Sequence, residues 1–183
     1  AARPAYDPAD VGLGIVHLGI GAFSRAHLAV YTDDVLAAGG GDWGICGVSQ
    51  RSRSVPDLLR PQDGLYSLLV RGAGRTRCRV IGSVREVIAA GDAPRDLSDR
   101  IAEPRVRVVS WTVTEKGSRH DPASGRLRAD DPDLRADAEG RPPMTVVGRL
   151  VAGLARRRLR DAGGLTVLCC DNLPQNGRVV RGL

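Results

Sequence analysis

The chain alternates short apolar runs with segments in which apolar side chains recur at helical spacing. The runs carry β-branched side chains and are bounded by glycine or polar residues, as buried strands are. Six runs have this character: residues 15–20, 44–49, 65–70, 78–84, 106–113 and 165–170. Three segments are predicted helices: residues 24–38, 94–101 and 145–161. This alternation predicts an α/β fold with a doubly wound, mainly parallel sheet covered on both faces.

The residues beside these helices predict where they begin and end. Ser24 is a suitable N-cap for the first helix, and Gly39 is expected to end it. The last helix has arginines in its final turn, where the helix dipole favours positive charge, and apolar residues near one face. These apolar residues are Val146, Val147, Leu150, Val151, Leu154 and Leu159. Residues 1–12 are expected to form an irregular lead-in, and residues 117–143 a long surface loop.

Composition narrows the classes of function. The formal net charge is +6, but the arginines are scattered among acidic residues except near 156–160. Only 3% of the residues are aromatic, so stacking platforms for bases are scarce and no nucleic-acid partner is expected. No apolar run is long enough to span a bilayer, and no signal peptide is recognisable. The sequence therefore predicts a cytoplasmic protein with no membrane partner.

The four cysteines are expected to be reduced and mostly buried. They form no C-x-x-C pair and have no histidine at ligand spacing, so no metal site is predicted. Three of them lie in strand-like apolar runs, where thiols act as small hydrophobic groups. The cysteines are Cys46, Cys78, Cys169 and Cys170.

Residues 17–27 (HLGIGAFSRAH) place two glycines between a predicted strand and a predicted helix. Gly19 allows a tight turn, and Gly21 lets the backbone approach a pyrophosphate at the helix N-terminus. Ser24 occupies the third small position of the dinucleotide-binding fingerprint, where glycine or alanine is usual. Glycines in such turns are often only structural, but the surrounding strand–turn–helix–strand order has the length of a βαβ unit. The segment therefore predicts a Rossmann-type cofactor turn.

The end of the second predicted strand bears on the choice of cofactor. An acidic residue there bonds the adenosine ribose, whereas arginine with small hydroxyl residues suits a 2′-phosphate. The sequence has Arg51, Ser52 and Arg53, with no acidic residue before Asp57. A guanidinium matches phosphate geometry. We expect NAD or NADP as the cofactor, with NADP favoured; a solvated basic loop is the alternative.

Polar residues also follow two later strands, in residues 112–117 (TVTEKG) and 171–177 (DNLPQNG). Ligands of open α/β sheets gather beyond the carboxyl ends of the strands, so both segments are candidates for function. Turns use the same residue types, and position alone leaves the two interpretations open.

Six segments in this order together resemble the mannitol dehydrogenase and fructuronate reductase family of polyol-specific, metal-independent dehydrogenases. They are HLGIGAFSRAHLAVYTDD, DWGICGV, QDGLYSL, RVIGSVRE, VVSWTVTEKG and LTVLCCDNLPQNG. The resemblance covers nearly the whole chain after the first dozen residues. Two positions depart from it: Ser24 stands where many relatives have His, and Ser118 where they often have Tyr.

The resemblance implies that residues 13–183 form an N-terminal Rossmann-type domain. The family's helical C-terminal substrate domain, with its general-base lysine, is not matched by this sequence and is an expected partner. Lys116 belongs to the TEKG motif and does not correspond to that lysine. The implied activity is hydride transfer between nicotinamide and a secondary alcohol of a polyol or aldonate, with ketose or keto-uronate reduction in reverse. The alternative is a truncated, non-catalytic dinucleotide-binding module, and the 183 residues alone are expected to oxidise little polyol.

The resemblance also assigns site residues. The loop on the pyrophosphate and nicotinamide side corresponds to Gly19, Ile20, Gly21, Ala22 and Phe23. The adenosine-ribose region corresponds to Arg51, Ser52 and Arg53. The cofactor cleft corresponds to Thr112, Val113, Thr114 and Glu115. Asn172 resembles the asparagine that hydrogen-bonds the reacting oxygen of the substrate and stabilises the charge that develops on it.

Overall fold

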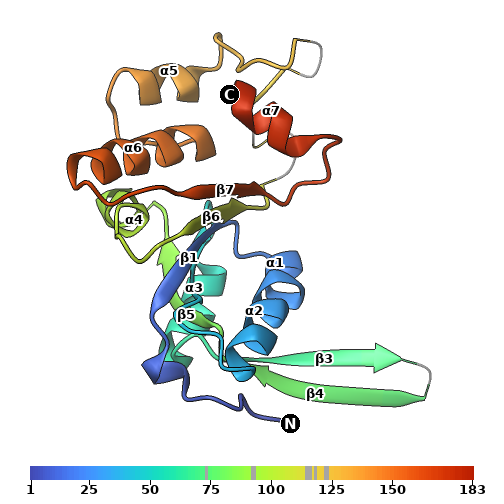
Figure 1. The fold of residues 1–183 in the computed structure, drawn as a ribbon. Helices are drawn as coiled ribbons and strands as arrows, with labels where there is room; N and C mark the ends of the chain where they lie inside the picture. Colours follow the sequence, from blue (N-terminus) through green and yellow to red (C-terminus); the bar gives the residue numbers. More distant parts are fainter. Residues whose placement is uncertain (73, 92–93, 114–116, 118, 122–123) are drawn as a thin grey trace.

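Five parallel strands form the central sheet, in the order β5-β2-β1-β6-β7 (Figure 1). The computed structural model describes residues 1–72, 74–91, 94–113, 117, 119–121 and 124–183. The strands are β1 (Leu13–Leu18), β2 (Gly44–Ser49), β5 (Val84–Ala89), β6 (Val108–Trp111) and β7 (Thr166–Cys169). The strand order reverses at β1, which lies between β2 and β6, and ligands of open α/β sheets bind at such a reversal. The predicted parallel sheet is confirmed.

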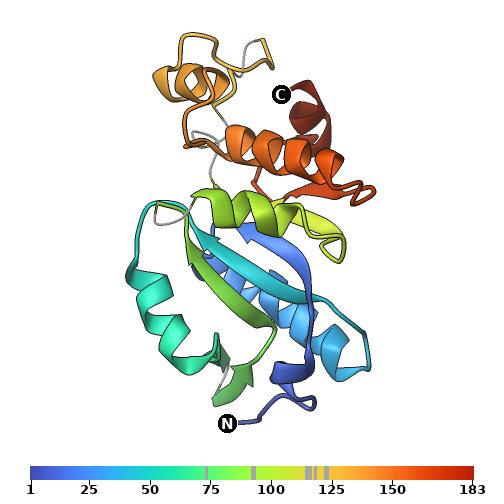
Figure 2. The same ribbon diagram turned by 90° about the vertical axis from the view of Figure 1, so that its left-hand side faces the viewer.

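Helices cover both faces of this sheet, as predicted. The alternating side chains of β1 show the division, because Val16 and Leu18 pack with α4 and α6 whereas Ile15 packs with α2 and α3. Helices α4 and α6 lie side by side on their face (Figure 2). The helices are α1 (Ala22–Ala26), α2 (Leu28–Ala37), α3 (Ser54–Leu59), α4 (Pro94–Ile101), α5 (Pro132–Ala138), α6 (Val146–Leu159) and α7 (Asn176–Gly182).

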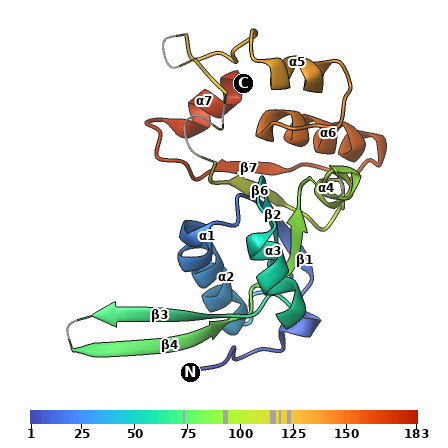
Figure 3. The ribbon, with the colours of Figure 1, turned by 180° about the vertical axis from the view of Figure 1, so that it is seen from behind.

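An antiparallel β-hairpin extends away from this body, as both Figure 1 and Figure 3 show. Its base is held by the buried carboxylate of Asp33. That carboxylate accepts hydrogen bonds from the Tyr6 hydroxyl at 2.6 Å and the Gly82 amide at 2.8 Å, and it pairs with Arg79 at 2.5 Å. Asp33 therefore fixes the hairpin and the N-terminal segment on α2. The hairpin strands are β3 (Tyr66–Gly72) and β4 (Arg75–Ile81).

The predicted order of elements is wrong in several places. The helix expected at 24–38 is interrupted, because α1 ends at Ala26 and α2 begins at Leu28, and neither α3 nor α7 was predicted. The strand expected at 78–84 is divided: β4 ends at Ile81 and β5 begins at Val84. Between them, the Gly82 amide donates a hydrogen bond to the Asp33 carboxylate. The loop expected at 117–143 contains α5, whose first amides are capped by the Asp131 carboxylate. An aspartate followed by proline begins a turn or a helix equally well, and here the helix forms.

Helix α6 buries only part of the apolar face expected from the sequence: Val146 is buried and Leu150 packs against the core. Thr145 caps its first turn by accepting a hydrogen bond from the Gly148 amide at 2.9 Å. Val151 is 58% exposed and Leu159 is 87% exposed, so the predicted apolar face is only partly buried. The buried residues of α6 are Val146, Arg149, Gly153 and Arg157. The inward stripe therefore contains two arginines.

Arg157 is buried because its guanidinium satisfies carbonyl groups that end other elements. Its side chain is 3% exposed, and all five of its N–H groups have acceptors between 2.8 and 3.0 Å. The acceptors are the carbonyl oxygens of Ile101, Glu103, Ala162, Gly163 and Gly164. Arg157 thus joins the end of α4 to the connection between α6 and β7.

We expect Arg157→Ala to lower the free energy of unfolding by roughly 3–5 kcal/mol, because it removes five hydrogen bonds to backbone carbonyl groups. Arg157→Lys should lie between this variant and the wild type, since an ammonium offers three donors. Arg158→Ala changes an exposed arginine of the same helix and should cost less than about 0.5 kcal/mol. Urea denaturation followed by circular dichroism measures all three, and similar midpoints for the Arg157 and Arg158 variants would contradict the expectation.

Candidate functional site

A cavity of about 440 Å³ opens at the carboxyl ends of β1, β2 and β6. The turn after β1 forms its floor, and the ends of β2 and β6 lie on either side of that turn. The start of α6 and part of the preceding connection complete the lining. The lining residues are 19–21, 49–52, Val55, 112–113, Gly117, Arg119, Asp133, 144–146 and Arg149.

The two glycines of the turn have different roles. Gly19 has a φ of +108°, and a Cβ there would lie 2.2 Å from the carbonyl oxygen of Thr112, so only glycine fits. Gly21 has an ordinary extended conformation, and a Cβ there would meet nothing nearer than the Gly19 oxygen at 3.9 Å. The protein itself therefore does not require glycine at position 21. The space beside Gly21 is left open on the wall of the cavity.

Ser24 closes the turn and does not cap the helix, which corrects the expectation from the sequence. The N-cap of α1 is Gly21, and Ser24 lies buried within α1. Its hydroxyl lies 3.2 Å from the Gly19 oxygen and 3.1 Å from the Gly21 oxygen, and it donates its hydrogen back into the turn. Because Gly21 provides no side-chain acceptor, the first amides of α1 have no side-chain cap among the residues that the structure describes.

A directed chain of hydrogen bonds joins this turn to β6. The Thr112 hydroxyl donates its one hydrogen to the Gly19 carbonyl at 3.1 Å, so it accepts from Nε2 of His17 at 3.0 Å. Nδ1 of His17 then has no hydrogen and accepts from the Ser110 hydroxyl at 2.8 Å. His17 is 1% exposed, and burial lowers its pKa to about 4. The neutral imidazole therefore holds β1, β6 and the turn in one register.

The structure brings together part of the site that the sequence assigns. Gly19, Ile20 and Gly21 line the cavity with Arg51, Ser52, Thr112 and Val113. The other assigned residues in the described part of the chain lie outside the lining: Ala22, Phe23, Arg53 and Asn172.

The residues outside the lining have identifiable environments. Phe23 is 54% exposed and stacks on His27, with ring centroids 5.0 Å apart. The Arg53 side chain lies 3.8 Å from the Asp57 carboxylate. Thr114 and Glu115 fall outside the residues that the structure describes.

Asn172 is exposed at the carboxyl end of β7, next to a residue that ties β7 to β6. The Asp171 carboxylate accepts a hydrogen bond from the Val113 amide at 2.8 Å. The Asn176 side chain donates to the carbonyl oxygens of Cys169 and Asp171 at 3.0 and 3.2 Å. Asp171 and Asn176 therefore have structural roles in the DNLPQNG segment, and they place Asn172 beside the strand end.

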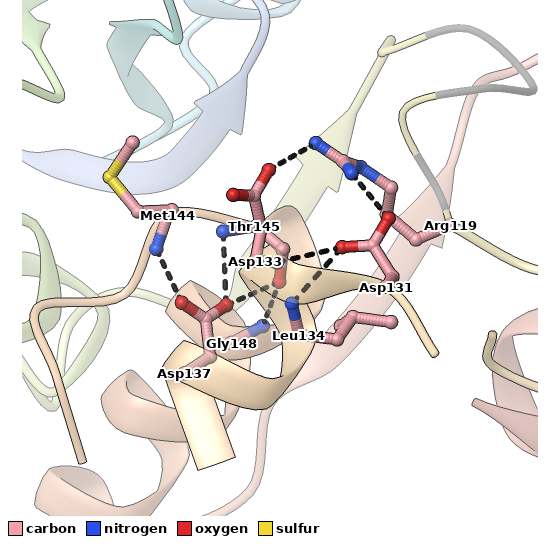
Figure 4. Close-up of polar contacts among 8 residues, drawn as sticks. All are labelled: Arg119, Asp131, Asp133, Leu134, Asp137, Met144, Thr145 and Gly148. Atoms are coloured by element: carbon pink, nitrogen blue, oxygen red, sulfur yellow. Dashed lines mark hydrogen bonds and ion pairs between the residues drawn. The ribbon is translucent and has the colours of Figure 1, made fainter. Parts of the chain in front are cut away.

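Sequence reasoning missed the wall formed by α6 and the connection before it. Asp137 accepts hydrogen bonds from the Met144 amide, the Thr145 amide and the Thr145 hydroxyl at 2.7, 3.0 and 2.6 Å (Figure 4). This network fixes the start of α6 against α5. The N-cap pattern of Thr145 was readable from the sequence, but its place beside the β1 turn was not, because that contact is long-range.

Two arginines on this wall have contrasting electrostatic surroundings. Arg119 pairs with Asp131 and, at 2.6 Å, with Asp133, and these contacts raise its pKa (Figure 4). Burial instead lowers the pKa of Arg149, which is 4% exposed and forms no ion pair with a described residue. Nη1 of Arg149 and Nε2 of Gln50, also on the lining, are buried without a hydrogen-bond partner in the described part of the chain.

The described residues show neither a metal cluster nor a membrane-spanning helix. No cluster of three or more His, Cys, Asp or Glu side chains among them is arranged to hold a metal ion. None of the described helices is long and apolar enough to cross a membrane.

Residues 13–183 match the family model described as the mannitol dehydrogenase Rossmann domain. The chain belongs to the mannitol dehydrogenase family. It is 41% identical over 184 residues to a mannitol 2-dehydrogenase from Pyrenophora tritici-repentis, with 98% of this chain and 32% of the relative covered. It is 38% identical over 185 residues to a D-mannonate oxidoreductase from Escherichia coli, with 98% and 38% covered.

A solved structure of Pseudomonas fluorescens mannitol 2-dehydrogenase, in ternary complex with NAD and D-mannitol, has the same fold. The TM-score is 0.94 at 43% identity, and the match covers 99% of this chain and 38% of that one. The predicted Rossmann domain of this family is thus confirmed. The chain spans about a third of the length of the relatives it matches.

The burial of His17 predicts a pH dependence of stability. Its pKa is about 4 in the folded chain and about 6.5 when unfolded, so between these values the unfolded chain holds a proton that the folded chain does not. The free energy of unfolding is not reduced by protonation of His17 above pH 6.5. About 3 kcal/mol of it is lost as the pH falls to 4.

Urea denaturation at intervals from pH 7 to pH 4 measures this loss. His17→Gln should be less stable at pH 7 but should lose less stability on acidification than the wild type. His27→Gln removes an exposed histidine and should keep the wild-type slope. Parallel curves for the wild type and His17→Gln would show that the buried imidazole does not cause the dependence.

Proposed function

We propose that this chain is the dinucleotide-binding part of an NAD(P)-dependent polyol or aldonate dehydrogenase. The open space beside Gly21 is the observation that carries the proposal. Gly19 is required by the protein's own packing, but Gly21 is not, and its missing side chain leaves room where a ligand can reach the backbone. The uncapped amides of α1 and the unpartnered donors of Gln50 and Arg149 fit an acceptor-rich ligand such as a dinucleotide.

In this proposal the residues of the chain bind and orient, and the bound nicotinamide supplies the hydride acceptor or donor. The Gly19–Gly21 turn holds the pyrophosphate, and Thr112 with Val113 bounds the cleft on the β6 side. Thr114 and Glu115 are proposed to continue that side. Ala22 and Phe23 are proposed to border the turn from α1, outside the lining. Asn172 polarises the reacting oxygen of the substrate, held in place by its neighbour Asp171.

The general base is proposed to come from outside the described residues. The titratable side chains on the described lining are three arginines and Asp133, and Asp133 is paired with Arg119. His17 is unsuitable because both of its ring nitrogens are occupied within the sheet. The lack of a suitable base among the described lining residues favours a second candidate function. In it, the chain is a module that binds the cofactor and catalyses no turnover until further residues complete the site.

The substrate class follows from the relatives named above. One acts on mannitol by its name and is solved with D-mannitol, and another is named for D-mannonate. We propose a polyol or an aldonate as the alcohol and a ketose or keto-uronate as the product. Hydride transfer from the secondary alcohol carbon to nicotinamide, with loss of the hydroxyl proton to a base, gives that product.

Fluorescence titration of the 183-residue chain with NADH and with NADPH tests the proposal. We expect saturable binding of at least one of them. Gly21→Val fills the open space and should abolish binding while the chain stays folded, because the backbone at position 21 tolerates a side chain. Gly72→Val, in open space on the hairpin, is the matched control and should bind as the wild type does. A wild-type chain that binds neither dinucleotide would refute the proposal.

We further propose that NADP is preferred, because Arg51 and Ser52 line the cavity beyond β2. Arg51→Glu should weaken NADPH binding by about tenfold or more and leave NADH binding largely unchanged, since it replaces a phosphate partner by a like charge. Arg53→Glu, outside the lining, should have a smaller effect. An unaltered ratio of the two affinities in Arg51→Glu would contradict the preference.

A further inference from the structure

Arg149 is a buried cation on the cavity wall to which the sequence analysis assigned no role. It lies one turn into α6, where side chains lean back toward the helix N-terminus and hence toward the carboxyl edge of the sheet. Its side chain is 4% exposed. The lining that it shares includes both the Gly19–Gly21 turn and the Arg51–Ser52 segment.

The contacts of Arg149 with the described residues leave part of its guanidinium unsatisfied. Nε donates to the Pro143 carbonyl at 3.2 Å, and Nη1 is buried without a partner in the described part of the chain. The carboxylate that acts on it electrostatically is that of Asp137. That carboxylate already accepts hydrogen bonds from Met144 and Thr145 at the start of α6 and forms no ion pair with Arg149.

The other arginines in similar places are satisfied by the protein. All five donors of Arg157 have carbonyl acceptors, and Arg119 is paired with two aspartates. Arg149 has neither arrangement. Burying a charge without a partner is unfavourable, and among the described residues Arg149 has no partner for Nη1, which suits a site for an anion beside the cavity.

We propose that Arg149 binds a phosphate oxygen of the dinucleotide. The inference rests on the proposed function and adds a residue, and a source of binding energy, that the family's glycine turn does not supply. A phosphate brings the negative charge that Arg149 lacks, and its oxygens accept from guanidinium N–H groups in the geometry that arginine favours. The dinucleotide offers two sources of this chemistry: the pyrophosphate over the β1 turn and, in NADP, the 2′-phosphate beside Arg51.

Arg149→Met removes the charge while keeping a flexible side chain of similar reach. Titrations of this variant and the wild type with NADH, NADPH and adenosine separate the possibilities. We expect the variant to bind a dinucleotide about tenfold or more weakly and to bind adenosine unchanged. Weaker binding of both dinucleotides assigns the contact to the pyrophosphate, and weaker binding of NADPH alone assigns it to the 2′-phosphate. Arg158→Met, on the exposed face of α6, is the matched control and should bind like the wild type.

A second measurement distinguishes a binding role from a structural one. Without ligand, Arg149→Met should melt at the wild-type temperature or above it, because an unpaired buried charge has been removed. A ligand-free variant that melts several degrees lower would show that Arg149 supports the fold and would overturn the inference. Unchanged affinity for both dinucleotides, or an equal loss for adenosine, would also overturn it. A wild-type chain that binds neither dinucleotide would refute the proposed function and this inference together, whereas normal wild-type binding with an unaffected variant would refute this inference alone.

Discussion

The close approach of β1 and β6 at Gly19 is the constraint on which the cavity depends. A Cβ at Gly19 would lie 2.2 Å from the Thr112 oxygen, so the turn can reach β6 only without a side chain. Once there, the Thr112 hydroxyl and the His17 imidazole lock the two strands together. Gly21 comes two residues later in the same turn, and its α-carbon faces open space. Packing inside the sheet thus determines where the backbone is exposed to a ligand.

Helix α6 shows how the same residue type is buried for two reasons. At one end, Arg157 gives every donor to a backbone carbonyl oxygen, so its charge is well solvated by the fold. At the other end, Arg149 is equally buried but holds one carbonyl. Both arginines lie on the buried side of α6. Arg149, near the start of the helix, lines the cavity, whereas Arg157, near its end, does not. The lining of the cavity therefore contains buried donors, on Arg149 and Gln50, that the described residues leave without acceptors.

The sequence predicted the sheet well because its signals are local. Glycine-bounded runs such as 44–49 coincide with β2, and the first turn was found from Gly19 and Gly21. Errors arose where long-range contacts compete with local preference. Ser24 has the chemistry of an N-cap, but the carbonyls of the turn take its hydrogen bond. The buried face of α6 could not be read from hydrophobic periodicity, because two of its buried positions are arginines.

The two sides of the cavity consequently differ in how far they can be predicted from the sequence. The floor and the β2 side come from contiguous motifs, so a reader of the sequence can recognise a dinucleotide site there. The opposite wall exists only because Asp137 fixes the start of α6 and brings Thr145 and Arg149 across to β6. Changes around Asp137 would therefore alter the cofactor site while every glycine of the turn remained intact. The motifs that indicate the cofactor class are local in the sequence, but the shape of the cavity also depends on the packing of α5 and α6.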